Sequence, residues 1–487
     1  MSRSFRVCNY PQRRKRREHR KATSESVSPL IQDTATEQSS SPQDRRENEY
    51  YRVPPEPTGA NILAESFLDP EVFNRAQLET PRGNLDEVIT KQVSDLVGSV
   101  LDIKATSKAF FDTVHAWMPI ISRIQFSKTL LNRLSYRRAE LYLLILSMRL
   151  CCSRVTTART LLYRTTKQLH FEIEGLGAPS LPVLQASVLI ALYELGHAIY
   201  PAASLSVAHC ARYATALGID KTVTAKGIAG LEWIEEEERR RVWWSILTLD
   251  RFTNLYDTQH HLVTPDPDSG SFLPVDDQAW NAGTSRPEDS FPLGSANILL
   301  MGRFARFAQG AHLLSQVLHH IAEQSSDTTQ LRRTMLALVN LSNMEAHMRR
   351  LEFCTQTAVC YSGILLLEHP HVFRDDGIVE ELSPEAALIS EKFLEMAAHI
   401  SQRSESEIFD LVSPFLLHLV YKLASMHLRA SHINHSSSDA SKVDTLKQQL
   451  KILGGRWLAA HTYLSLLERQ EMLLVIQQHE ELHVLHG

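Results

Sequence analysis

The chain contains little cysteine, little glycine and no apolar run long enough to cross a bilayer. Of its 487 residues, six are cysteine and 19 are glycine. The cysteines have no regular spacing, which argues against a disulfide framework and favours reduced thiols in an intracellular protein. The strongest apolar run, at 141–148, ends at Arg149 and is too short for a transmembrane helix. The N-terminus is charged where a signal peptide is apolar, so we expect a protein that is neither secreted nor embedded in a membrane.

Common catalytic signatures are also missing, with one exception. The chain has no G-x-x-x-x-G-K-[ST] loop, no G-x-G-x-x-G after a strand and no G-x-S-x-G elbow. The exception is H-E-x-x-H at His479, Glu480 and His483, which in zinc hydrolases places two imidazoles on one helix face. Such a site needs a third protein ligand downstream, and only 484–487 follow. We therefore predict no enzyme, no catalytic residue and no cofactor in this chain as written. A zinc hydrolase is the least favoured alternative.

Charge is distributed unevenly along the chain. The formal net charge is −5, but the first 25 residues carry nine lysines and arginines against two glutamates, which leaves −12 for the remainder. Such a basic run contacts DNA phosphates or directs nuclear import, although a plain disordered tail has the same composition. Phosphate contacts are sensitive to salt and blind to sequence. The residues assigned to this role are Arg13, Arg14, Lys15, Arg16, Arg17, Arg20 and Lys21.

The next segment is predicted to be disordered. Residues 22–59 are rich in Ser, Gln, Glu, Pro and Arg and have almost no large apolar residue before Tyr50, so they cannot offset their chain entropy by burial. We divide the chain into a basic segment at 1–21, a disordered linker at 22–68 and a helical domain at 69–487. Residues 61–73 mix acidic and large apolar side chains, as activation segments do. The interpretation we favour for them is the first amphipathic helix of the domain.

Apolar residues recur at helical spacing over most of the remaining chain, and this periodicity together with the low glycine content predicts a large all-α domain. Asn84 is expected to cap the first long helix, Pro119 to end the second, and Gly218 to close another in a left-handed conformation. Between 260 and 292, prolines, glycines and aspartates predict a long connection of the kind that is often functional or mobile. The predicted helices are 85–97, 110–118, 141–152, 157–174, 181–196, 201–217, 233–255, 298–322, 331–348, 355–367, 384–400, 407–428 and 446–482.

The helix predicted at 233–255 has two halves. Glu235, Glu236 and Glu237 each precede an arginine by four residues, which is the favourable order for helical ion pairs. After the charges, apolar residues that include Trp243 and Leu247 recur at helical spacing. We therefore expect a long helix with a charged first half and a second half that enters the core.

The order E-E-R-R-R-V-W-W-x-x-x-x-L-D-R at 237–251 resembles the signature helix of the fungal-specific transcription factor domain. This domain is the middle homology region of the fungal zinc-cluster (binuclear, six-cysteine) transcription factors. Blocks at 110–126, 184–194, 211–220 and 273–280 resemble other parts of that domain and occur in the same order. The family implies an all-α regulatory domain that controls metabolic or secondary-metabolite genes in the nucleus and responds to a small-molecule effector, a protein partner or a homodimer partner. The signature positions are Arg239, Arg240, Arg241, Trp243, Trp244, Asp250 and Arg251.

The N-terminal sequence C-N-Y-P followed by a basic run resembles the end of the family's zinc cluster, in which Cys8 matches the sixth zinc ligand. No other cysteine precedes Cys151, and one thiolate cannot hold zinc in a tetrahedral site. Zinc is expected only if missing upstream cysteines exist, so either the chain begins inside a longer gene or the protein has lost the module. DNA binding is then weak or lost. The main alternative is a helical partner or scaffold, without DNA binding of its own, for an intact regulator.

Overall fold

A computed structural model describes most of the chain after residue 57. The described ranges are 58–77, 85–131, 138–177, 179–221, 223–228, 231–255, 261–295, 301–323, 328–349, 355–368, 382–402 and 410–486. The predicted basic segment, Cys8 and most of the predicted linker lie outside these ranges. The side chains of the H-E-x-x-H motif are also outside the description, although the backbone at these positions belongs to the last helix.

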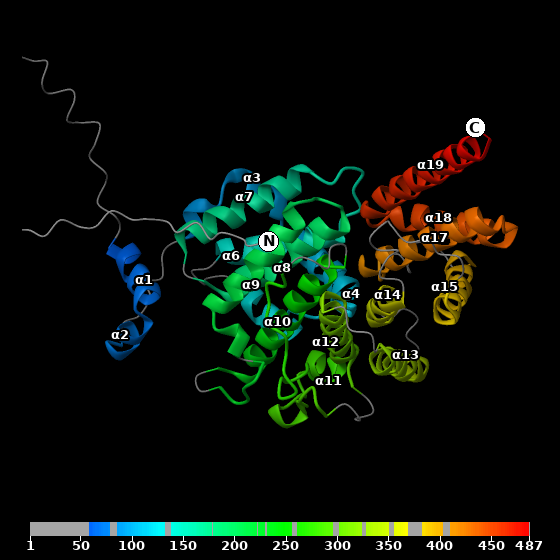
Figure 1. The fold of residues 1–487 in the computed structure, drawn as a ribbon. Coiled ribbons are helices and arrows are strands. Elements are labelled where there is room, and N and C mark those ends of the chain that lie inside the picture. The colour runs from blue at the N-terminus through cyan, green and yellow to red at the C-terminus, as the bar shows by residue number, and fades with distance from the viewer. Residues whose placement is uncertain are drawn as a thin grey trace, which may run out of the picture. The chain divides into compact units, whose positions relative to one another are not determined.

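The regular secondary structure of the described residues is helical, with one isolated antiparallel bridge between Phe272 and Pro292, and the all-α prediction is confirmed. No helix in the described ranges is both long and apolar enough to cross a membrane. Figure 1 shows the arrangement of the helices. They are α1 (Thr58–Leu68), α2 (Pro70–Arg75), α3 (Lys91–Val97), α4 (Val100–Asp112), α5 (Arg123–Leu131), α6 (Arg138–Cys152), α7 (Leu161–Leu176), α8 (Leu181–Gly196), α9 (Ala202–Ala216), α10 (Trp233–Thr253), α11 (Asp277–Ala282), α12 (Arg303–Ala322), α13 (Thr329–Arg349), α14 (Thr355–Glu368), α15 (Pro384–Gln402), α17 (Phe415–Asn434), α18 (Ser437–Gly454) and α19 (Ala459–His486).

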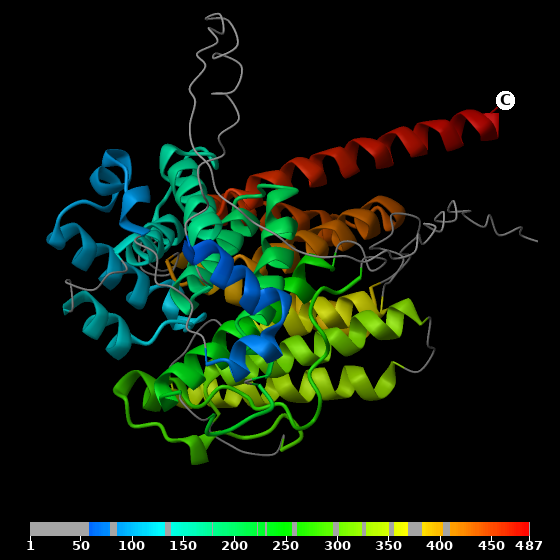
Figure 2. The ribbon, with the colours of Figure 1, turned by 90° about the vertical axis from the view of Figure 1, so that its left-hand side faces the viewer.

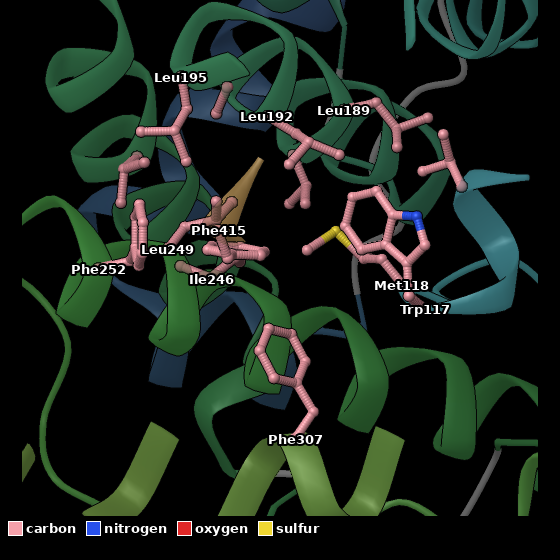
Figure 3. Packing of buried hydrophobic residues seen from close by; sticks show 14 of the residues in the cluster. Trp117, Met118, Leu189, Leu192, Leu195, Ile246, Leu249, Phe252, Phe307 and Phe415 are labelled. Atoms are coloured by element: carbon pink, nitrogen blue, oxygen red, sulfur yellow. The ribbon is translucent and has the colours of Figure 1, made fainter. Parts of the chain in front are cut away.

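The core is built around α8 and α10. Every residue of α8 except Pro182 is buried, and α8 packs against α6, α9 and α10. Beyond α10 lie α12, α14 and α17, with α18 and α19 packed on α17 (Figures 1 and 2). Phe415 at the start of α17 connects these layers, because its ring packs edge-on against Phe252 of α10 at 4.7 Å and against Phe307 of α12 at 5.4 Å between centroids (Figure 3).

Two predicted helix boundaries near the start of the domain are wrong. The helix expected at 85–97 is a short 3-10 turn at Leu85–Val88 followed by α3, which has its own cap at Thr90: the Thr90 Oγ1 accepts a hydrogen bond from the Val93 N–H at 3.2 Å. Asn84, the expected cap, lies outside the described residues. The helix expected at 110–118 is the end of α4, which starts after the capping box of Ser99 and stops before Thr113.

The helix predicted at 446–482 is interrupted. The helix α18 ends at Gly454 and α19 begins at Ala459, with Arg456 and Trp457 buried between them. A Cβ at position 454 would lie 2.4 Å from the His461 Nε2. The glycine at this position therefore lets His461 pack close to the end of α18. The helix predicted at 407–428 also starts late, at Phe415 after Pro414.

Trp457 fits against the end of α8, where only a glycine leaves room. A Cβ on Gly196 would lie 2.3 Å from the Trp457 Cε3, whereas a Cβ on Gly175 of α7 would meet nothing within 4 Å. Both glycines are in helices, so an alanine suits the backbone at either position.

We predict that Gly196→Ala lowers the free energy of unfolding by about 1–3 kcal/mol, because the methyl group overpacks the Trp457 contact. Gly175→Ala should instead raise it, by up to about 1 kcal/mol, because alanine reduces the entropy of the unfolded chain. Denaturation in guanidinium chloride measures both values. Changes of the same sign in the two variants would contradict this account of Trp457.

Candidate functional site

The three predicted ion pairs on α10 are present, but two of them lie in the core and not at the surface. Arg239 Nη2 is 2.8 Å from Glu235 Oε1, and this pair is partly exposed. The pairs of Glu236 with Arg240, at 2.9 Å, and of Glu237 with Arg241, at 2.8 Å, are almost completely buried. The first half of α10 is charged, as expected, and neighbouring segments cover these charges and supply hydrogen bonds to them.

Arg241 connects α10 to residues 261–295, which we call the α10–α12 connection. Its guanidinium donates to Asp277 Oδ1 and to the Val275 carbonyl, both at 2.8 Å, and lies 4.0 Å from the centre of the Trp280 ring. The partner carboxylate also takes part, since Glu237 Oε1 accepts the Val275 N–H at 2.9 Å. The resulting set of contacts holds both the backbone and the side chains of the connection against α10.

Arg240 and Glu236 hold a second segment in the same way. Arg240 pairs with both Glu236 and Glu237 and donates to the Ala225 carbonyl at 3.3 Å. Glu236 Oε2 accepts the N–H groups of Gly227 and Ile228 at 2.9 and 3.1 Å. The turn that precedes α10 is therefore fixed by the helix that follows it.

Asp250 and Arg251 repeat the arrangement at the other end of α10. Asp250 Oδ2 accepts the N–H groups of Val263 and Thr264 at 3.1 and 2.9 Å. Arg251 pairs with Asp266 at 2.9 Å and donates to Ser315 Oγ of α12 at 2.7 Å. The α10–α12 connection, predicted as a long and functional or mobile loop, is thus held by buried polar groups of α10 near its start, at 263–266, and near its middle, at 275–277.

The two signature tryptophans are buried, as predicted. Trp244 is completely buried and its Nε1–H donates to the Phe272 carbonyl at 2.9 Å, while Trp243 is 4% exposed. Of the seven signature residues only Arg239 is partly accessible. The residues that contact the α10–α12 connection are Arg241, Trp244, Asp250 and Arg251, and none of the six residues other than Arg239 is available for surface contacts.

Glu238 is absent from the predicted site residues but is the most perturbed carboxylate of α10. It is the one glutamate of the run with no arginine four residues later, since position 242 is a valine. Its Oε1 instead accepts the Ser122 N–H at 2.6 Å and the Gln185 Nε2–H at 3.3 Å. Burial raises the pKa of Glu238 to about 7, against the lowering effect of these hydrogen bonds. The missing arginine is the sequence signal that could have identified it.

His115 is buried, with 2% of its side chain exposed. Its Nε2 lies 2.9 Å from Asn281 Oδ1, and its ring stacks on Trp280 with centroids 6.0 Å apart. Burial, with Arg123 and Arg241 nearby, lowers the pKa of His115 to about 3, so the imidazole is neutral at physiological pH. Trp280 thus contacts both His115 and Arg241, which joins the 3-10 turn at Val114–Ala116 to the α10 network.

One group of residues has the connectivity of a serine-protease triad. Ser390 Oγ lies 2.7 Å from His427 Nε2, and His427 Nδ1 lies 2.9 Å from Asp439 Oδ1. Ser390 and His427 are each 1% exposed, and Ser390 is in the interior of α15, where the backbone N–H groups serve the helix and cannot form an oxyanion hole. We interpret this group as a buried hydrogen-bond chain that links α15, α17 and α18.

Sulfur and metal chemistry give no further site within the described ranges. Cys151, Cys210 and Cys360 are buried, and burial raises the thiol pKa of Cys151 and Cys210, which suits packed, protonated thiols. No group of three or more His, Cys, Asp or Glu side chains in the described part of the chain could hold a metal ion.

The fold and the signature helix together define a helical regulatory domain. The family model described as the fungal specific transcription factor domain matches residues 108–356, which run from α4 to the start of α14. The chain belongs to this family and is a transcription regulator. No solved structure matches it.

Three curated relatives are similar to parts of the chain. Transcription factor BOA15 of Botryotinia fuckeliana is 38% identical over 179 residues, which cover 36% of this chain and 97% of the relative. The azaphilone cluster-specific transcription factor azaR of Aspergillus niger is 26% identical over 208 residues, or 40% of this chain and 43% of azaR. The tropolone cluster transcription factor tropK of Talaromyces stipitatus is 26% identical over 198 residues, or 39% of this chain and 35% of tropK. The matched region thus spans less than half of azaR and of tropK.

Replacing either signature tryptophan should destabilise the whole domain. We expect Trp243→Ala and Trp244→Ala each to lower the free energy of unfolding by about 3–5 kcal/mol, the usual cost of removing a buried indole. As stability falls, the amount of the protein in the cell should fall too, so the loss should not be limited to the regulatory response. Leu101→Ala, at a position that is 76% exposed, is the control and should change stability by less than about 0.5 kcal/mol. Soluble tryptophan variants as stable as the control would disprove the packing interpretation.

Glu238 should make stability depend on pH near neutrality. Since its pKa is higher in the folded state than in the unfolded state, its unfavourable contribution appears as pH rises from about 4.5 to about 7 and is constant above that. Glu238→Gln keeps the acceptor for Ser122 but cannot ionise. The variant should therefore gain stability over the wild type, with a difference that grows to about 3 kcal/mol between pH 5 and pH 8.

The measurement is chemical denaturation of both proteins across this pH range, with Glu468→Gln, at an exposed position of α19, as the matched control. A difference between the Glu238→Gln variant and the wild type that stays constant with pH would contradict the raised pKa.

Proposed function

We propose that this protein acts in the nucleus to control a gene set for secondary metabolism, and that its helical domain receives the regulatory signal. The observation that carries the proposal is the family match over 108–356, together with two relatives named as cluster-specific or cluster transcription factors, azaR and tropK. The buried α10 network supports a regulatory and not a catalytic role for the domain, because its charges satisfy one another and the backbone. The azaphilone and tropolone products belong to those relatives and do not identify the product here.

The α10–α12 connection is the segment through which a signal would reach α10. Arg241 holds it near Val275 and Asp277, and Arg251 holds it near Asp266. A small-molecule effector or partner protein that displaces the connection therefore removes the acceptors that the connection supplies to buried guanidinium groups and leaves only those on α10, which costs several kcal/mol. Because of this cost, we expect the connection to be either bound to α10 or displaced from it, with few intermediate positions.

For DNA we propose phosphate contacts only, through Arg13, Arg14, Lys15, Arg16 and Arg17, and for nuclear import we propose the same run together with Arg20 and Lys21. Cys8 resembles the sixth zinc ligand of the family's cluster. It is the only cysteine before Cys151, and one thiolate does not complete a zinc site. The second candidate function is a partner of an intact regulator that supplies the sequence-specific contacts. Genomic sequence upstream of the Met1 codon distinguishes the two. Five suitably spaced cysteine codons in frame would restore the zinc cluster, and a stop codon would favour the partner role.

Deleting the gene in its host should lower the transcripts of a contiguous set of biosynthetic genes, and the wild-type gene should restore them. Transcript sequencing checks this outcome, and unchanged transcript levels would refute the proposal. Binding of the purified chain to two unrelated duplexes should be equally strong. It should weaken with salt with a log–log slope of about −4 to −5, since each phosphate contact contributes about −0.9.

A variant with alanine at Arg13, Arg14, Lys15, Arg16 and Arg17 should lose this slope and its nuclear accumulation. The matched control removes five exposed cations from the helical domain and so makes the same change in net charge. Its positions are Lys104, Arg164, Arg212, Arg333 and Lys392. A preference for one duplex, or equal losses in the variant and the control, would contradict phosphate contact by the N-terminal segment.

A further inference from the structure

The first two helices expose large apolar side chains beside acidic ones. Phe67 is 55% exposed, Leu68 85% and Val72 60%. The exposed acidic residues of the same helices and their junction are Glu65, Asp69 and Glu71. Exposed apolar groups of this size that cluster together usually mark an interaction site.

The exposed residues lie on a locally well-formed helical segment. The Asp69 N–H bonds to the Glu65 carbonyl and the Phe73 N–H to the Asp69 carbonyl, both at 3.0 Å, so helical hydrogen bonding continues from α1 into α2. Asp69 Oδ1 also caps α2 by accepting the Val72 N–H at 3.0 Å. Leu68 and Val72 are four residues apart, and this spacing places them on one side of the helical segment.

The fold makes little use of this apolar surface. The hydrophobic core begins with Leu85 and ends with Leu467 among the described residues, and no side chain of α1 or α2 belongs to it. Among the described side chains of the two helices, Phe73 is the one that is apolar and buried. The interpretation of 61–73 as simply the first amphipathic helix of the domain therefore does not account for the exposed apolar residues.

We propose that this surface, formed by Phe67, Leu68 and Val72 with the acids Glu65, Asp69 and Glu71, docks into a protein of the transcription machinery. The proposal rests on the role in transcription proposed above. The partner has an apolar groove that accepts one face of a helix, with lysines and arginines along its rim. The mixture of acidic and apolar residues is the composition of activation segments.

The charge of this surface favours a partner protein over a second copy of the chain or an anionic membrane. The surface carries three carboxylates against the single cation Arg75, which pairs with Glu71. A second copy of the same surface would bring like charges together, and an anionic membrane would repel it. A basic rim on a partner protein attracts the acids and steers the apolar residues into the groove.

The test uses the full chain fused to an unrelated DNA-binding domain that recruits it to a reporter gene in fungal cells. The combination Phe67→Ala, Leu68→Ala and Val72→Ala should lower reporter output about tenfold, as loss of apolar anchors does at other interfaces. Alanine preserves the helix. The conservative combination Phe67→Leu, Leu68→Met and Val72→Ile should retain the output.

The matched control removes three similarly exposed apolar side chains from α19, with Met472→Ala, Leu473→Ala and Ile476→Ala, and should leave the output unchanged. A photo-crosslinking phenylalanine analogue in place of Phe67 then identifies the bound protein. Once purified, this protein should bind the wild-type chain, lose about tenfold in affinity for the alanine combination, and bind more weakly in added salt.

The acidic residues are tested with Glu65→Gln, Asp69→Asn and Glu71→Gln, which keep the cap at position 69 and should remove most of the salt dependence. Unchanged output from the alanine combination, or a wild-type fusion that leaves the reporter at baseline, would refute the proposal. Crosslinking to a second copy or to the chain's own N-terminal segment would also refute it. Gene deletion tests the control of transcription separately. Each of these outcomes can therefore occur while the proposed function stands.

Discussion

The central constraint on this fold is that arginines on α10 are buried and must have acceptors. Removing a guanidinium from water costs several kcal/mol, and only close carboxylates and carbonyls offset that cost. Arg241 and Arg251 meet this requirement through residues 261–295, and Arg240 through the turn before α10. The positions of these segments therefore depend on directional polar contacts, whereas apolar packing alone tolerates rearrangement.

Periodicity was sufficient to predict the helices whose ends are determined locally. The range 181–196 is reproduced residue for residue as α8, and the helix predicted at 141–152 differs from α6 only by starting three residues late. Local caps at Thr90 and Ser99 moved two helix starts, and one further failure depends on a distant residue. The interruption after Gly454 accompanies the close approach of His461 and the burial of Trp457 against Gly196, and the contact with Gly196 leaves no trace in the local pattern.

The sequence predicted the ion pairs of α10 but not the segments that cover them. The spacing of four residues identified Glu235–Arg239, Glu236–Arg240 and Glu237–Arg241. It could not show that two of these pairs are buried, because the covering acceptors lie in other segments, with Val275 and Asp277 more than 30 residues later. The burial of His115 could not be predicted for the same reason, since its partners Asn281 and Trp280 are more than 160 residues away.

The contacts of Arg456 and Trp457 have a consequence for synthesis of the protein. Arg456 donates to the carbonyl of Cys151, which lies 305 residues earlier, and Trp457 covers the end of α8. At roughly 5–20 residues per second, a ribosome needs roughly 15–60 s to make the intervening chain. During that interval α6 and α8 have left the ribosome, but the side chains that complete their environment do not yet exist. The cooperative folding unit is therefore longer than the 108–356 region that defines the family, and a nascent chain stopped at that boundary would still expose part of its core to chaperones and proteases.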